Sequence, residues 1–108
     1  MVEANGFQYD VAPTGNVFEL SMTWIDSWNN YSRHTTALVF TLDDMITIAA
    51  AIADKRRFDM PDMSGGYDEY YGRYYIDTGS MATQINTENI AKVAKYLHDS
   101  VRGFIDAE

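Results

Sequence analysis

Aromatic and acidic residues gather between positions 67 and 75, where the chain reads Tyr-Asp-Glu-Tyr-Tyr-Gly-Arg-Tyr-Tyr. Five of the eight tyrosines in the chain lie in this segment. Tyrosine offers rigid contact area and a hydrogen-bonding hydroxyl at small entropic cost, which is the chemistry of protein-binding surfaces. Because alternate residues of a strand face opposite sides, the rings would lie on both faces of a sheet. The segment therefore predicts an aromatic surface that is partly exposed.

The tyrosines of this segment have different expected roles. Tyr67 and Tyr70 flank two acids next to Gly65-Gly66, so we expect them in a loop where folding does not need their rings. Tyr74 lies deeper in a predicted strand and is expected in the core, while cross-strand packing of Tyr71 and Tyr75 is the alternative to binding. The candidate partner-binding residues are Asp62, Tyr67, Asp68, Glu69, Tyr70, Tyr71, Arg73, Tyr75 and, from an earlier loop, Trp28.

Trp28 lies in the polar segment 26–33, where packing explains a tryptophan poorly. An aromatic anchor for a partner is one interpretation. A ring folded back over a helix end is the other. Trp24, in contrast, continues the apolar alternation of residues 18–24 and is predicted to lie in the core.

No catalytic or cofactor signature appears in the sequence. The chain has no cysteine, and its two histidines, His34 and His98, stand far apart without a neighbouring metal-ligand pattern. The glycines match neither phosphate-binding motif. The acids between 59 and 69 do not follow the alternate spacing of a calcium loop. We therefore predict a protein that is not an enzyme and that has no cofactor and no dedicated metal site.

The charge balance defines the class of partner. Sixteen acidic residues against eight basic ones give a net charge of −8. This balance argues against direct binding of nucleic acid or of an anionic membrane, because both need clustered cations. An acidic, aromatic surface suits a basic protein groove, including one that normally holds nucleic acid, where carboxylates would stand in for phosphates.

Hydropathy patterns indicate the elements that position these residues. Alternation at 7–11, 18–24 and 35–41 predicts an antiparallel three-stranded meander. A helix follows Thr41, a strand is predicted at 73–78 with 81–85 extending it or adding a fifth strand, and a second helix begins at Thr87. The fold class is α+β: one antiparallel sheet of four or five strands with two helices on one face, in the order βββαβ(β)α. The apolar residues of the second helix, Ile90, Val93, Leu97 and Val101, are expected to face Phe18, Leu20, Met22 and Trp24.

Length and composition predict a single compact domain over residues 1–108, because 46% hydrophobic content is ample for one core. The N-terminus resembles no secretory signal, so we expect a cytoplasmic protein.

The predicted function is that of a small acidic protein-binding module, a stoichiometric inhibitor or adaptor. In size and charge the chain is similar to phage and mobile-element proteins that disarm host defences, such as anti-CRISPR proteins, which would place it in the host cytoplasm. The alternative is a self-associating assembly subunit, a homodimer formed through the alanine-rich first helix or through a strand edge near residues 71–75. An uncharacterised enzyme ranks third.

Overall fold

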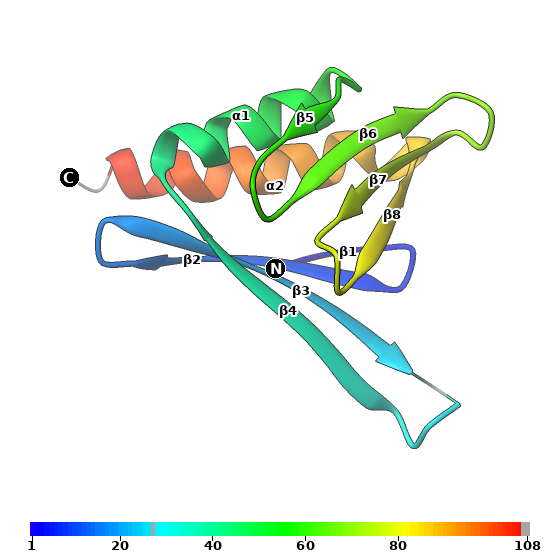
Figure 1. The fold of residues 1–108 in the computed structure, drawn as a ribbon. Helices are drawn as coiled ribbons and strands as arrows, with labels where there is room; N and C mark the ends of the chain where they lie inside the picture. The colour runs from blue at the N-terminus through cyan, green and yellow to red at the C-terminus, as the bar shows by residue number, and fades with distance from the viewer. Residues whose placement is uncertain (27, 107–108) are drawn as a thin grey trace.

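Eight strands and two helices make up the fold of residues 1–26 and 28–106, which the computed structural model describes (Figure 1). In chain order they are β1 (Val2–Ala4), β2 (Phe7–Thr14), β3 (Val17–Asp26), β4 (Ser32–Phe40), α1 (Leu42–Ala53), β5 (Phe58–Asp59), β6 (Ser64–Asp68), β7 (Arg73–Asp77), β8 (Ala82–Asn86) and α2 (Thr87–Asp106). Within these residues, neither helix has the length and apolar character needed to cross a bilayer.

The strands form two antiparallel sheets of four strands each, ordered β1-β2-β3-β4 and β5-β6-β7-β8. The α+β class and the two helices are confirmed. The prediction of a single sheet of four or five strands is wrong, because β1 adds to the meander and residues 58–86 build a second sheet. The loop expected around Gly65-Gly66 and Tyr67 is instead strand β6, which spans Ser64–Asp68. Gly65 lies in β6 against the Phe58 ring, where a Cβ atom would collide with that ring.

Helix α1 begins where the sequence places it. The Thr41 side chain accepts a hydrogen bond from the Asp44 amide at 3.2 Å, and Asp43 and Asp44 occupy the first turn. Both features stabilise a helix N-terminus. The helix buries Met45, Ile48 and Ile52. Its apolar stripe therefore faces the core, as the spacing predicts.

One core joins the helices to both sheets. The expected apolar residues of β3 and of α2 are buried, apart from Trp24, which is 39% exposed. The prediction that Trp24 is core is therefore wrong. The arrangement differs too, since α2 packs against β1, β2 and β8, while α1 packs against β3, β4 and β5. The long β3–β4 hairpin extends beyond the helices (Figure 1), and Trp24 lies near the end of β3.

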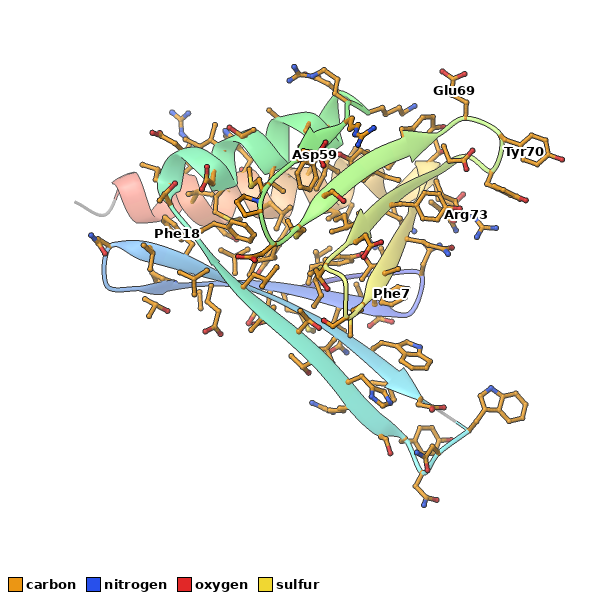
Figure 2. The ribbon with its side chains drawn as sticks, in the orientation of Figure 1. Phe7, Phe18, Asp59, Glu69, Tyr70 and Arg73 are labelled. Atoms are coloured by element: carbon orange, nitrogen blue, oxygen red, sulfur yellow. The ribbon has the colours of Figure 1, made fainter. Side chains whose placement is uncertain are left out.

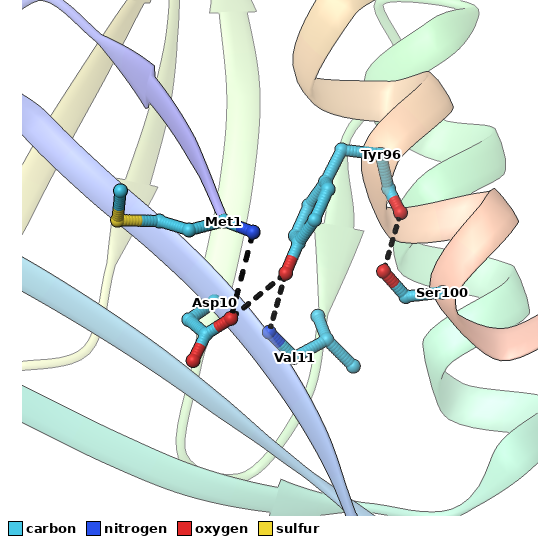
Figure 3. Close-up of polar contacts among 5 residues, drawn as sticks. All are labelled: Met1, Asp10, Val11, Tyr96 and Ser100. Atoms are coloured by element: carbon cyan, nitrogen blue, oxygen red, sulfur yellow. Dashed lines mark hydrogen bonds and ion pairs between the residues drawn. The ribbon is translucent and has the colours of Figure 1, made fainter.

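Helix α2 is fixed to β2 by a small polar network (Figure 3). The Tyr96 hydroxyl donates to Asp10 Oδ1 at 2.8 Å and accepts from the Val11 amide at 3.2 Å. The N-terminal amino group lies 3.8 Å from the same Asp10 oxygen. Burial raises the pKa of Tyr96. The hydroxyl therefore stays protonated and able to donate.

The two sheets are joined through a buried pair of hydroxyl side chains. Tyr9 on β2 and Thr83 on β8 are both fully buried. Burial raises the pKa of Tyr9 to about 12, and the nearby Thr83 hydroxyl offsets part of that rise. Nevertheless, in the part of the chain that the structure describes, neither hydroxyl has a hydrogen-bond partner of good geometry. Leaving buried polar atoms unpaired costs stability, so the junction is held by packing.

Candidate functional site

The β6–β7 turn (residues 69–72) displays the most exposed tyrosines of the cluster. Asp68 Oδ1 accepts hydrogen bonds from the amides of Tyr70 at 2.9 Å and Tyr71 at 3.2 Å. The Gly72 amide donates to the Asp68 carbonyl at 2.9 Å. Gly72 has a φ of 65°, a left-handed conformation that glycine adopts without strain. The sequence Asp-Glu-Tyr-Tyr-Gly thus encodes a tight turn, and the Asp68 carboxylate helps to form it.

A second set of bonds ties this turn to the start of α2. The Gly72 carbonyl accepts from the Thr87 hydroxyl at 2.7 Å and from the Thr87 amide at 3.1 Å. The Tyr67 and Thr87 hydroxyls lie 3.1 Å apart. Thr87 was predicted only as a helix start, and its contact with the turn had no signal in the sequence. The turn is consequently braced by the tertiary structure.

Tyr70 and Tyr71 project from this braced turn. Their rings are 87% and 59% exposed and meet edge to face, with centroids 4.8 Å apart. Figure 2 shows Glu69 and Tyr70 pointing away from the body of the protein. The Arg73 guanidinium lies 5.5 Å from the centre of the Tyr71 ring and donates to Gln84 Oε1 at 2.6 Å. Two rings, a carboxylate and a fixed guanidinium therefore share one end of the second sheet.

The remaining tyrosines divide between core and surface. Tyr74 is fully buried, and its hydroxyl donates to the Arg56 carbonyl at 2.7 Å. Burial raises its pKa to about 12, although the Arg56 charge acts in the opposite direction. Tyr67 packs against the core, with the Lys55 ammonium 5.0 Å from its ring centre. Tyr75 is half-buried beside Gly66. The expectation that Tyr67 lies in a loop free of packing is therefore wrong, because β6 carries it onto the core.

The acids that sequence places in one loop lie on two surfaces. Asp68 and Glu69 lie at the β6–β7 turn, whereas Asp62 precedes β6 and lies at its other end. Asp62 lines a groove of about 480 Å³ with Asp59 and Asp77. Among the described residues, no group of three potential ligands is arranged to hold a metal ion. A continuous acidic loop over 59–69 is thus not formed, because an extended strand separates its two halves.

The β3–β4 turn carries the second exposed aromatic site. Trp28 is 96% exposed and Tyr31 73% exposed. The Trp28 amide donates to Asp26 Oδ1 at 3.0 Å, and the Ser32 amide donates to the Asn29 carbonyl at 3.0 Å. The Trp28 ring is not folded back over a helix end.

Trp24 and His34 form a stacked pair on the same hairpin. Their ring centroids are 5.1 Å apart, and a cavity of about 380 Å³ lies beside them, lined also by Phe7 and Met81. The predicted strand ends at Trp24, whereas β3 continues to Asp26, so this exposed pair has no clear signal in the sequence.

Comparison with known protein families, with curated proteins and with solved structures finds no match for this chain.

Proposed function

We propose that the chain is a small acidic protein-binding module, a stoichiometric inhibitor or adaptor, whose main contact is the β6–β7 turn. The observation that carries this proposal is the exposure of Tyr70, 87%, on a backbone held by hydrogen bonds from both sides of the turn. Aromatic rings are enriched among the residues that dominate binding energy. A ring on an ordered backbone loses little entropy when a partner covers it.

The chemistry of the partner follows from charge. The chain has a net charge of −8, and Glu69 lies beside the exposed rings. Within the described part of the chain, the cations Arg56, Arg57 and Lys95 are already paired with carboxylates. A basic protein surface is therefore the favoured partner, and direct contact with nucleic acid or membrane is not part of the proposal. A more specific form of this proposal is that the chain mimics nucleic acid on a basic protein groove. Its size and charge support an anti-defence role such as that of anti-CRISPR proteins.

The test is affinity capture from an extract of the native host, followed by mass spectrometry. The tagged wild-type chain is compared with the double variant Tyr70→Ala, Tyr71→Ala. Ile46→Ala is the matched control, because Ile46 is 42% exposed and lies on α1, away from the turn. We expect one stoichiometric partner to be captured by the wild type and the control but not by the double variant. Equal capture by all three proteins contradicts the proposal.

Self-association is the second candidate function. The predicted edge near residues 71–75 is wrong, because β7 lies between β6 and β8. Strand β4, in contrast, is the last strand of its sheet.

A further inference from the structure

Strand β4 has one edge without a partner. It pairs with β3 along its whole length, from Asp26↔Ser32 to Phe18↔Phe40, and it is the last strand of its sheet. Within residues 1–26 and 28–106, no strand pairs with its other edge. The amide and carbonyl groups along that edge therefore form a template for a further strand.

The other sheet edges are short or covered, and β4 differs from them. Strands β1 and β5 have three and two residues, and the Asn86 amide of β8 donates to Asn5 Oδ1 at 3.2 Å. Strand β4 has nine residues, no proline and an unbroken register. Its only charged or titratable residues are Arg33 and His34, both near one end. Natural proteins protect exposed edges with short strands, prolines, bulges or charges, and β4 carries little of this protection.

We propose that β4 pairs with β4 of a second copy of this chain, antiparallel and centred on Thr36, so that two meanders join into one continuous sheet. This pairing is a two-fold interface in which the same residues meet in both directions. It sets Arg33 against Val39, His34 against Leu38, and Thr35 against Ala37. All nine residues are paired, and no two like charges lie opposite each other.

The surface beside the β4 edge favours a second copy of the chain as the pairing partner. The groove of about 480 Å³ next to Thr36 and Leu38 contains Asp59, Asp62 and Asp77, and among the described residues no lysine or arginine lines it, although Arg57 pairs with Asp59 from outside. A strand added at the edge brings its inward-facing side chains beside this groove. A second β4 brings His34, which the pairing sets against the groove residue Leu38, and no carboxylate, whereas Arg33 faces the other side of the sheet with Val39. The imidazole N–H can donate a hydrogen bond to a groove carboxylate, whereas most other segments of this acidic chain would add negative charge.

The test is sedimentation equilibrium of the intact protein over a range of concentrations. Val39→Lys is the informative variant, because Val39 is 58% exposed and the substitution sets a lysine against Arg33 of the second copy. Two such like-charge pairs form in each dimer, and we expect the dimer dissociation constant to rise about tenfold. The double variant Arg33→Glu, Val39→Lys restores an opposite-charge pair and should return the constant to near the wild-type value.

Ala12→Lys is the matched control. Glu19 lies opposite both Ala12 and Val39, so the control adds the same charge on the other side of Glu19, away from the edge. It should leave the dissociation constant unchanged. A wild-type protein that stays monomeric up to about 1 mM overturns the proposal. A dimer that responds equally to Ala12→Lys and Val39→Lys, or that the double variant does not restore, also overturns it.

Discussion

The β3–β4 turn and the β6–β7 turn both expose aromatic side chains, but their backbones are held differently. At the β3–β4 turn the two hydrogen bonds described above join residues of segment 26–32 only. Asn30 and Tyr31 there have φ values of 54° and 58°, which are unfavourable for residues with a side chain. At the β6–β7 turn the positive φ belongs to Gly72, whose carbonyl is also bound by Thr87 of α2.

This difference changes the entropy that is lost when a partner binds. A partner that covers Tyr70 meets a backbone already fixed by α2, whereas one that covers Trp28 meets a hairpin end held by local bonds. Binding energy is reduced by the entropy lost on ordering the contact residues. Exposure alone therefore does not identify the better contact site, and the braced turn is favoured even though its rings are slightly less exposed.

The largest expected change in the free energy of unfolding distinguishes the buried Tyr74 from the exposed Tyr71. Tyr74→Ala should lower the free energy of unfolding by about 3–5 kcal/mol, because it empties a fully buried aromatic site. Tyr71→Ala should change it by less than about 0.5 kcal/mol, as is usual at exposed positions. Urea unfolding of the two variants checks both values. Similar losses would mean that the turn is part of the core.

Alkaline pH should destabilise the protein through its buried tyrosines. The pKa values of Tyr9 and Tyr74 are each raised from 10.0 to about 12. The folded state therefore keeps two protons that the unfolded chain releases. Stability from this source is fully present below pH 10 and is lost as pH rises from 10 through 12. Unfolding free energies measured across that window should fall, and Tyr9→Phe should make the fall smaller. A flat profile would contradict the burial of these hydroxyls.

A smaller loss of stability is expected when the backbone of the β6–β7 turn is strained. Gly72→Ala should cost about 1–2 kcal/mol, because alanine is strained at a positive φ. Its Cβ atom would also lie 3.3 Å from the Thr87 hydroxyl. At the other turn, Asn30→Gly should be neutral or slightly stabilising. Equal and small effects in thermal melts would show that the two turns are held alike, which removes the basis of the comparison.

The smallest expected effect is on the stability of the two exposed anchors. Tyr70→Ala and Trp28→Ala should each leave the unfolding free energy within about 0.5 kcal/mol of the wild-type value. Both side chains are nearly fully exposed. Differential scanning calorimetry provides the measurement. A clear loss for either variant would mean that the ring packs against the protein in solution.

Periodicity and capping residues made part of the fold predictable. The alternation of Phe18, Leu20 and Met22 and the cap at Thr41 placed β3 and α1 correctly, because these signals are local. The second sheet was only partly predictable. Its β6 strand contains Ser64-Gly65-Gly66, residues of low strand propensity, and it forms because Gly65 admits the Phe58 ring. That contact depends on tertiary structure.

The candidate site was predictable to a similar extent. The tyrosine cluster could be recognised as a candidate surface because residue type is visible in the sequence, and its exposed members lie at the β6–β7 turn. Its division into the packed Tyr67 and the exposed Tyr70 depends on where β6 ends. The separation of Asp62 from Glu69 depends on the same strand. Residue spacing along the chain cannot show which end of a strand a carboxylate occupies.

We propose that the braced β6–β7 turn is the main contact with a protein partner. The most direct test is a calorimetric titration of the captured partner with the wild-type chain, Tyr70→Ala and Trp28→Ala. We predict that Tyr70→Ala weakens binding by about 1–4 kcal/mol, the range for aromatic hot spots, and that Trp28→Ala weakens it less. An unchanged dissociation constant for Tyr70→Ala would contradict the claim.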